Sequence, residues 1–199
     1  MFRTPIGTKY TKAYEKYGVS HKTLAWKSKQ AQLIRFKQLI DGLEIKGKHV
    51  LDVGCGFGDL VDYLEKVGKA ASYTGVDITP QFIDKSKKHH PEHSFYCCDY
   101  FKHPVDESFD IIICNGVLNG NVEDVINVRE KAIEVMFDHA NEVVAFTMAG
   151  SHHQPENKDT NRVWYADSIE ITVFCASLTK KLVLKQQYRP KDFTIQMFK

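Results

Sequence analysis

A short apolar run that ends in three closely spaced glycines constrains this chain more than any other feature. Residues 50–53 read Val-Leu-Asp-Val, and Gly54, Gly56 and Gly58 follow at alternate positions. The run is too short for a helix and is typical of a buried strand; an amphipathic helix is expected after it, over about 59–67. Glycine allows a sharp turn and lets a ligand approach the backbone closely. A glycine turn between a strand and a helix is how open α/β sheets bind adenosine-containing cofactors at the carboxyl ends of their strands.

The spacing of these glycines separates two classes of cofactor. Dinucleotide-binding folds carry G-x-G-x-x-G/A, in which the last small residue lets the helix pack closely on the strand. Here the spacing is G-x-G-x-G, and Asp59 stands where the third small residue is expected. Residues 50–59 closely resemble the first motif of class I S-adenosylmethionine-dependent methyltransferases. That resemblance implies a backbone loop around the methionine part of S-adenosylmethionine, formed by Gly54, Cys55, Gly56 and Gly58.

An acidic residue at the end of the second predicted strand is expected to bind the ribose of the cofactor. This strand is Ser72–Asp77. Asp77 lies roughly 20 residues beyond the glycine loop, where a carboxylate accepts hydrogen bonds from both ribose hydroxyls of an adenosine. Ile78 follows it in the expected cofactor site, and Thr79-Pro80 is expected to begin a helix, with Thr as the N-cap.

The resemblance assigns further contacts to residues that follow the third and fourth strands. In this family an acidic residue just past the third strand, expected over 93–97, hydrogen-bonds the adenine amino group. Asp99 fits this role, with Tyr100 available beside the ring; a solvated turn is the alternative for Asp99. After the fourth strand the family places a motif between the sulfonium and the substrate. Asn115 and Gly116 stand there, and Asn115 could line the cofactor, orient a substrate or simply form a turn.

One more cofactor contact is expected near the start of the chain. A helix is predicted over Ser20–Asp41, with Gly42 as its stop. Within it, Trp26 is followed by Lys and Gln, an element that sits beside the cofactor in a group of small bacterial methyltransferases that this chain resembles. Packing in the core is the alternative for Trp26. Residues 1–45 are thus expected to form a helical segment that packs on the sheet or caps the cofactor mouth.

The polar stretch 149–166 is the expected substrate loop. It follows a fifth strand predicted over 142–147, and insertions at the carboxyl end of a parallel strand usually supply substrate contacts. A histidine there could remove a proton from an amine or a phenol, and an arginine could anchor a carboxylate. The candidates, each of which could also be an ordinary surface residue, are His152, His153, Arg162, Trp164 and Tyr165.

The predicted fold is α/β, a Rossmann-like sheet of mostly parallel strands with helices on both faces, and the resemblance to class I methyltransferases implies seven strands in the order 3-2-1-4-5-7-6. The last two strands, 181–188 and 192–198, are joined too tightly for a parallel crossover and should form an antiparallel hairpin. A dinucleotide fold would continue with another βα unit instead. With 199 residues, we expect a single domain whose cofactor-binding core spans 46–199.

Composition and charge exclude several other classes of protein. The formal net charge of +2 is too small to indicate binding to nucleic acid or to an acidic membrane surface, and Asn115-Gly-Val-Leu lacks the prolines of enzymes that methylate DNA bases. No apolar run approaches the roughly 20 residues that span a bilayer, and no signal peptide is recognisable at the N-terminus. Five cysteines without a disulfide framework indicate reduced thiols and a cytoplasmic location.

A metal site is not expected from the spacing of the possible ligands. Structural zinc sites usually show paired ligands a few residues apart, and here Pro91 separates the histidines while two cysteines are adjacent on a strand. A histidine near the end of a helix is favoured by the helix dipole in any case. The residues weighed are His89, His90, His93, Cys97, Cys98 and His103.

The sequence therefore predicts an S-adenosylmethionine-dependent methyltransferase that modifies an oxygen or nitrogen atom of a small molecule or a short peptide, with a carboxylate as one candidate acceptor. The first alternative is a non-catalytic interaction module that keeps the adenosine-cofactor pocket. The second is a nicotinamide-dependent oxidoreductase, which Asp59 and the terminal hairpin disfavour.

Overall fold

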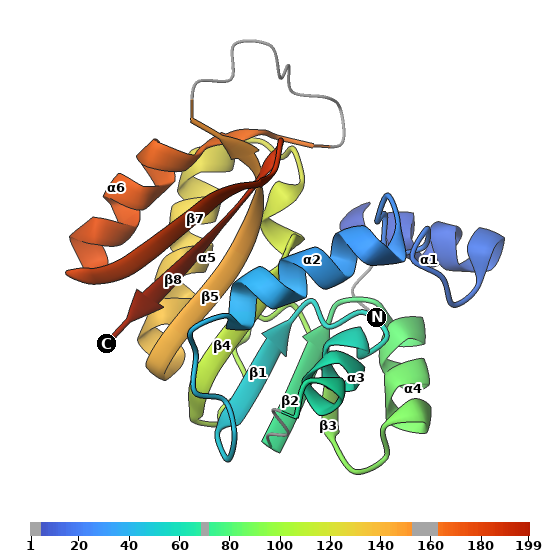
Figure 1. Cartoon of the computed structure of the whole chain (residues 1–199). Helices are drawn as coiled ribbons and strands as arrows, with labels where there is room; N and C mark the ends of the chain where they lie inside the picture. Colours follow the sequence, from blue (N-terminus) through green and yellow to red (C-terminus); the bar gives the residue numbers. More distant parts are fainter. Residues whose placement is uncertain (1–4, 69–71, 153–162) are drawn as a thin grey trace.

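A sheet with parallel strands at its centre forms the middle layer of the protein (Figure 1). The computed structural model describes residues 5–68, 72–152 and 163–199. Its strands are β1 (His49–Val53), β2 (Ser72–Asp77), β3 (Ser94–Cys97), β4 (Phe109–Asn115), β5 (Ala140–Ser151), β6 (Ala166–Asp167), β7 (Lys181–Arg189) and β8 (Asp192–Phe198). Their order is β3-β2-β1-β4-β5-β8-β7. Neighbours from β3 to β5 are parallel, whereas β8 is antiparallel to both β5 and β7.

The predicted topology is confirmed, with one strand more than expected. The sequence predicted the order 3-2-1-4-5-7-6 for seven strands. The additional two-residue strand β6 precedes the hairpin in the chain, so the two hairpin strands are numbered β7 and β8 instead of 6 and 7. β6 pairs in parallel with the end of β5, through Gly150 and Ser151. Two residues are too few to show a hydrophobic period, so the sequence carried no signal for this strand.

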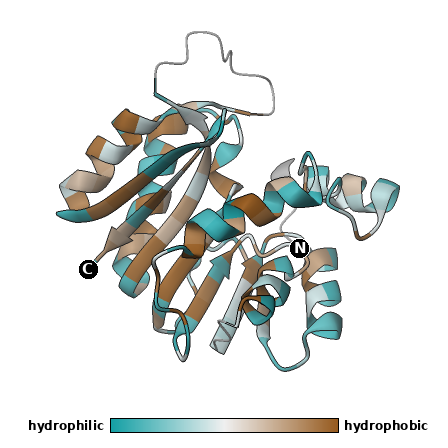
Figure 2. Cartoon of the chain, in the orientation of Figure 1, coloured by the Kyte–Doolittle hydropathy of each residue, from teal (hydrophilic) through white to brown (hydrophobic). Residues whose placement is uncertain are grey.

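Helices cover both faces of the sheet, as predicted. One face carries α2 (Lys29–Ile40), α3 (Asp59–Lys66) and α4 (Pro80–His89), and the other carries α5 (Val125–His139) and α6 (Ser168–Leu178). Along β4, Ile111 and Ile113 pack with the first group of helices, and Ile112 and Cys114 with the second. Successive side chains of a strand point to opposite faces, so a sheet covered on both sides needs a continuously apolar central strand. Figure 2 shows the apolar residues gathered in these central strands.

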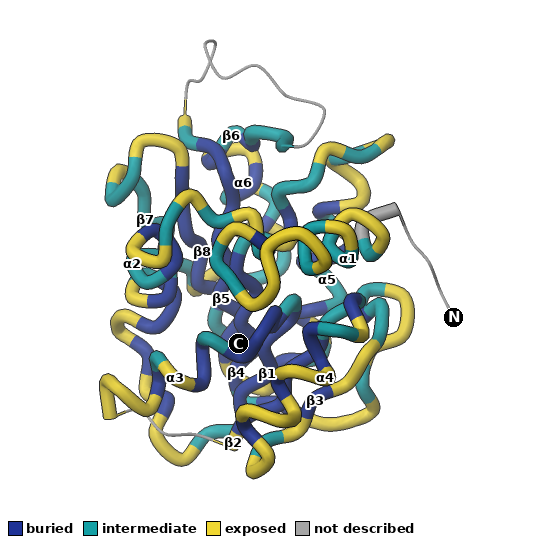
Figure 3. Tube along the Cα trace, turned by 90° about the vertical axis from the view of Figure 1, so that its right-hand side faces the viewer, coloured by how far each residue is buried: buried dark blue, intermediate teal, exposed yellow. Residues whose placement is uncertain are grey.

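The N-terminal region differs from the single helix predicted over 20–41. A first helix, α1 (Pro5–Tyr17), is followed by turns, and α2 begins only at Lys29. The Ser28 side chain caps α2 by accepting a hydrogen bond from the Ala31 N–H at 3.1 Å. The prediction used Ser20, which has the same capping chemistry, and was wrong about where this helix starts. α1 lies beyond the carboxyl ends of β1 and β2, and much of it is exposed (Figure 1 and Figure 3).

β5 is longer than the strand predicted over 142–147 and extends into the expected substrate loop. Its end pairs with the start of β8, where Ala149 lies opposite Asp192, and the Gly150 N–H donates to the Lys191 carbonyl at 3.0 Å. Ala149 is the last residue of β5 that pairs with β8, and the final two residues, Gly150 and Ser151, pair with β6. Residues 153–162 of the predicted loop lie outside the described part of the chain. Every described helix is too short or too polar to cross a membrane.

Candidate functional site

The chain reverses its winding between β1 and β4, which lie side by side at the centre of the sheet. From β1 the chain continues to β2 on one side, and from β4 it continues to β5 on the other. Such a switch point leaves a crevice at the carboxyl ends of the strands, where open α/β sheets bind their ligands. The segments at this edge are 54–58 after β1, Asp77 at the end of β2, Asp99 after β3, and Asn115–Gly116 after β4. The structure therefore brings the sequence-predicted cofactor residues to one edge.

The glycine loop after β1 needs the absence of side chains at each of its glycines. Gly54, Gly56 and Gly58 have φ angles of 78°, 58° and 84°, in the left-handed region that side chains disfavour. A Cβ atom on Gly54 would overlap Val117, and one on Gly56 would lie 3.0 Å from the Leu24 side chain. The Val117 and Leu24 side chains thus lie directly against the loop backbone. A backbone cradle that only glycine permits fits the methionine part of an S-adenosyl cofactor.

Asp77 joins this loop to the end of β2. Its Oδ2 accepts a hydrogen bond from the Gly56 N–H at 3.1 Å, and its Oδ1 accepts one from the Thr79 N–H at 2.8 Å. Burial raises the pKa of Asp77 to about 6, against the opposing effect of these two backbone donors. A carboxylate has about four acceptor positions, more than the hydrogen bonds from the Gly56 and Thr79 N–H groups occupy. This arrangement fits the two adjacent hydroxyls of a ribose.

The start of α4 shows why Asp77 is held so firmly. Thr79 occupies the predicted N-cap position and Pro80 the first turn, but the Thr79 side chain makes no capping hydrogen bond. The Asp77 carboxylate bonds the Thr79 N–H instead. The predicted start of the helix is confirmed, and the acidic residue of the site supplies a bond to its first backbone donor.

The segment between α1 and α2 closes over the site. Trp26 lies against Gly116, because a Cβ on Gly116 would be 3.0 Å from the tip of the indole ring. The Arg35 guanidinium lies over this indole, 4.7 Å from the ring centre. On α1, burial and the nearby charge of Asp77 both raise the pKa of Tyr10. Trp26 and Gly116, two predicted cofactor residues, are therefore in contact, whereas the proximity of Tyr10 to Asp77 was not foreseen.

Asp99 and Tyr100 differ in their accessibility to a ligand. The Asp99 carboxylate is half-buried and lies 3.3 Å from the exposed Lys102 ammonium. Tyr100 is only 2% exposed, and its hydroxyl is 3.1 Å from His139 Nδ1 at the end of α5. The ring of Tyr100 thus packs in the core below the edge where Asp99 lies. The contact of either residue with adenine stays a prediction.

Two buried donors lie beside the loop that follows β4. Asn115 is 9% exposed; its Oδ1 accepts a hydrogen bond from the Thr147 hydroxyl at 2.7 Å, and its Nδ2 has no hydrogen-bond partner within the described residues. Arg129 on α5 is 6% exposed and donates through Nη2 to the Gly120 carbonyl, while its Nε is likewise unpartnered in the described chain. Buried donors are nearly always bonded, so these two are candidates for contact with a ligand. Arg129 carried no signal in the sequence.

The described ends of the predicted substrate loop lie close to this region. Trp164 donates its backbone N–H to the Asn119 carbonyl at 3.0 Å, and Val163 forms a β-bridge with Gly120. His152 Nδ1 is 3.3 Å from the carboxylate of Asp167, the N-cap of α6. Of the remaining candidates, Tyr165 lies under the Lys191 ammonium at 5.4 Å, and His153 and Arg162 lie outside the described residues.

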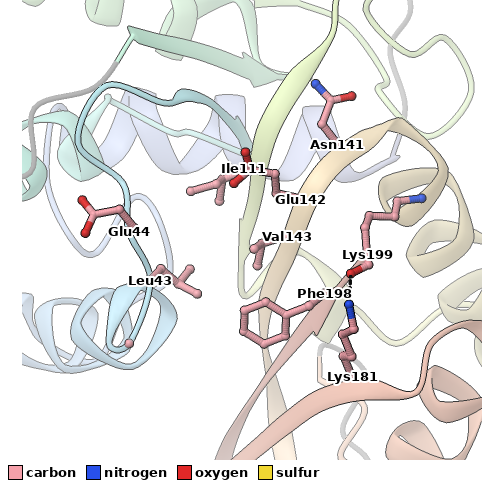
Figure 4. Close-up of a pocket in the computed structure, with 10 residues that line it drawn as sticks. Leu43, Glu44, Ile111, Asn141, Glu142, Val143, Lys181, Phe198 and Lys199 are labelled. Carbon is pink, nitrogen blue, oxygen red and sulfur yellow. Dashed lines mark hydrogen bonds between the residues drawn. The ribbon is translucent and has the colours of Figure 1, made fainter.

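A pocket of about 610 Å³ opens at the opposite edge of the sheet (Figure 4). Leu43, Val143 and Phe198 form its apolar floor, and Lys181 and Glu142 stand at its rim. It lies at the amino ends of β4 and β5, away from the glycine loop. Open α/β sheets bind cofactors at the other end of their strands, so we do not assign the cofactor to this pocket.

Comparison with known proteins gives the family of the chain. Residues 44–188 match the family model described as a methyltransferase domain. The chain belongs to the methyltransferase domain family. This methyltransferase domain is 40% identical over 90 residues to the ubiquinone biosynthesis O-methyltransferase of Coxiella burnetii, a stretch that makes up 43% of the chain and 38% of that relative. The chain therefore matches well under half of that relative's length.

Solved structures confirm the fold of this methyltransferase domain. Magnesium protoporphyrin IX methyltransferase from Synechocystis PCC 6803, with bound SAH, aligns with a TM-score of 0.64 at 14% identity, covering 96% of this chain and 92% of that one. A TehB-like SAM-dependent methyltransferase from Corynebacterium glutamicum gives a TM-score of 0.64 at 19% identity, covering 96% and 99%. At such identities the similarity extends to the fold.

Proposed function

We propose that this methyltransferase domain transfers a methyl group from S-adenosylmethionine to a small molecule or a short peptide. The observation that carries the proposal is the hydrogen bond from the Gly56 N–H to the Asp77 carboxylate. It holds a carboxylate acceptor next to the three glycines of the 54–58 loop, at the switch point of the sheet. Membership of the family supports the same function.

The cofactor contacts follow from the residues at this edge. We assign the methionine part to the backbone of 54–58, the ribose to Asp77, and the adenine to Asp99 and the neighbouring Ile78. Trp26 and Gly116 would border the site opposite the glycine loop, since they lie in contact. When bound, the cofactor supplies a methyl group on a sulfonium, and the chain supplies binding, alignment and exclusion of water. Alignment alone can contribute roughly 7–11 kcal/mol to the lowering of the barrier.

The acceptor is proposed to carry an oxygen acid such as a carboxylate. The unpartnered donors Asn115 Nδ2 and Arg129 Nε support this choice, because a guanidinium and an amide NH₂ both donate to carboxylate oxygens. An ionised carboxylate needs no general base. For an amine or a phenol, His152 is the candidate base, since Asp167 lies close enough to orient its ring.

We also propose a reducing, cytoplasmic environment for the protein. All five cysteines are free thiols, and three of them, Cys55, Cys114 and Cys175, are buried in the core. Free thiols persist in compartments where glutathione and thioredoxin keep them reduced.

Calorimetric titration with S-adenosylhomocysteine and, separately, with NAD tests the cofactor assignment. We expect binding of S-adenosylhomocysteine and none of NAD; the reverse result would establish a nicotinamide-dependent enzyme instead. Release of S-adenosylhomocysteine from S-adenosylmethionine is then measured across carboxylic acids, phenols, amines and short peptides. Binding without release for any acceptor would favour the non-catalytic module over the enzyme.

A further inference from the structure

Three potential metal ligands converge on the side of the glycine loop that faces away from the crevice. Asp62 comes from α3, and His89 and His90 stand at the end of α4. α3 and α4 lie near each other on the same face of the sheet (Figure 1). One ligand atom from each of the three residues lies within 4.8 Å of the others. No step of the proposed methyl transfer uses these side chains.

His90 has an unpaired nitrogen directed into this cluster. The residue is 4% exposed, and its Nε2 has no hydrogen-bond partner in the described part of the chain. It lies 3.7 Å from Asp62 Oδ1, which is too far for a hydrogen bond. Two ligands of one tetrahedral zinc ion, each bonded at about 2.0–2.2 Å, lie roughly 3.3–3.5 Å apart. The distance between His90 Nε2 and Asp62 Oδ1 is thus close to the distance between two ligand atoms of one zinc ion.

A carboxylate stands behind the His90 ring. Glu92 Oε1 is 3.9 Å from His90 Nδ1, the ring nitrogen that does not face Asp62, and 3.6 Å from His93 Nε2; both distances are longer than a hydrogen bond. Histidines that bind metals usually direct their second nitrogen toward a carboxylate, a carbonyl or water, which fixes the tautomer and leaves the first nitrogen free to coordinate. Glu92, the His90 ring and the position that an ion beside Asp62 would occupy therefore follow one another in the order carboxylate, imidazole, ion.

We propose that Asp62, His89 and His90 bind one divalent first-row transition ion of the Zn²⁺ type, with Glu92 orienting His90. Two imidazole nitrogens and one carboxylate oxygen suit zinc and its neighbours, whereas Mg²⁺ and Ca²⁺ prefer oxygen ligands alone. Three protein ligands leave a fourth position for water. The spacing along the sequence did not indicate this site because Asp62 comes from a different helix.

The site lies directly behind the cofactor loop. A Cβ on Gly58 would lie 2.8 Å from His90 Cδ2, so the imidazole packs against the last glycine of the loop. Phe95 packs on the same ring, with the ring centres 6.3 Å apart. A bound ion would hold this ring to α3, the helix that begins immediately after Gly58.

Titration of the chelator-treated protein with ZnCl₂ by calorimetry, and with CoCl₂ by visible absorption, tests the proposal. We expect one equivalent of ion and a cobalt spectrum typical of tetrahedral nitrogen and oxygen ligands. Asp62→Asn and His89→Gln should each weaken Zn²⁺ binding at least tenfold. Both side chains are exposed, so both variants should fold, which circular dichroism checks.

Matched controls are Asp84→Asn on α4 and His103→Gln, both exposed and outside the cluster; each should bind Zn²⁺ as the unaltered protein does. The proposal is overturned if the unaltered protein binds no Zn²⁺, or if Asp62→Asn and His89→Gln bind it unchanged. A cobalt spectrum with thiolate charge-transfer bands would assign the ion to Cys97 or Cys98 and would also overturn it.

The neighbouring group of Glu65, Glu92 and His93 also offers three potential ligands, and binding of the ion there would contradict the proposal. If Glu65→Gln and His93→Gln abolish binding while Asp62→Asn does not, the ion belongs to that group and the assignment to Asp62, His89 and His90 is wrong. If Glu65→Gln leaves the affinity unchanged, the assignment is supported.

Discussion

The carboxylate of Asp77 and the backbone N–H of Gly56 are joined by a hydrogen bond of 3.1 Å. This bond links the turn after β1 to the end of β2, just before the chain continues into α4. The second oxygen of the same carboxylate is fixed by the Thr79 N–H. The acidic residue that the sequence predicted for ribose binding is therefore oriented by the backbone before any ligand arrives.

Replacement of Asp77 should weaken cofactor binding without unfolding the protein. Asp77→Ala removes the acceptor for two ribose hydroxyls, and hydrogen bonds to a charged group are worth about 1–3 kcal/mol. Calorimetry with S-adenosylhomocysteine measures the loss, and Asp84→Asn on the exposed side of α4 is the control. An affinity unchanged by Asp77→Ala would remove the ribose assignment.

Cofactor affinity should depend on pH through the same residue. Burial raises the pKa of Asp77 to about 6 from its ordinary value of 3.8. Below pH 6 the carboxyl group is protonated and loses acceptor capacity, so the affinity for S-adenosylhomocysteine should increase as the pH rises through 6 and then level off. Calorimetry between pH 5 and 8 follows the change. In Asp77→Asn, which cannot titrate, the same pH range should give a flat profile.

The glycine loop should reject side chains for reasons of space as well as backbone conformation. A residue other than glycine in the left-handed region costs roughly 1–2 kcal/mol, and this cost applies equally to Gly56 and to Gly47, whose φ is 76°. A Cβ at Gly56 would lie 3.0 Å from Leu24, whereas a Cβ at Gly47 would meet no atom of the described residues within 4 Å. Both Gly56→Ala and Gly47→Ala should lower the melting temperature. We expect only Gly56→Ala to reduce S-adenosylhomocysteine binding, and equal binding by the two variants would contradict the loop assignment.

Local sequence signals predicted those parts of the fold that depend on local structure. The strand before Gly54, the acidic residue Asp77 and the tight connection around Pro190 each reflect a short stretch of chain, whereas the strand order was implied by the resemblance to methyltransferases and is confirmed. Where two residues were each suitable to begin the same helix, the sequence did not indicate which of them does so. Ser20 and Ser28 both have the side chain of a suitable N-cap, and in the structure Ser28 caps α2.

Features set by contacts between distant segments were beyond the sequence. The length of β5 reflects its pairing with β8 and β6, and the approach of Tyr10 to Asp77 depends on how α1 packs at the edge of the sheet. The cluster of Asp62 with His89 and His90 likewise requires α3 to lie next to the end of α4. A pattern read along one segment contains none of this information.

The buried carboxyl group of Asp52 should make the protein less stable as the pH rises. Asp52 on β1 is 3% exposed and accepts a hydrogen bond from the Tyr73 hydroxyl at 2.7 Å, and burial raises its pKa to about 7. The folded protein therefore retains a proton that the unfolded chain has lost, so this contribution to stability is complete below pH 3.8 and is lost as the pH rises toward 7. The free energy of unfolding of Asp52→Asn, measured in urea, should fall less between pH 5 and 8 than that of the unaltered protein. Parallel pH profiles would show that Asp52 ionises normally in the folded state.

The ion pair between Arg35 and Asp192 should support both the fold and the cofactor site. Asp192 at the start of β8 is buried and accepts from Arg35 on α2 and from Arg189, and Arg35 also stacks on Trp26. Removal of one partner of a buried pair leaves uncompensated charge, so Asp192→Ala should destabilise the protein by about 3–5 kcal/mol in urea denaturation.

Asp41→Asn provides the matched control for this pair. Asp41 also connects the end of α2 to the hairpin, through Lys185 at 3.3 Å, but its side chain is exposed, so its removal should cost less than about 1 kcal/mol. Because Arg35 holds the indole that borders Gly116, Asp192→Ala should also weaken S-adenosylhomocysteine binding at a temperature where the variant is still folded, whereas Asp41→Asn should not. A loss of stability with unchanged affinity would show that Trp26 keeps its position without Arg35.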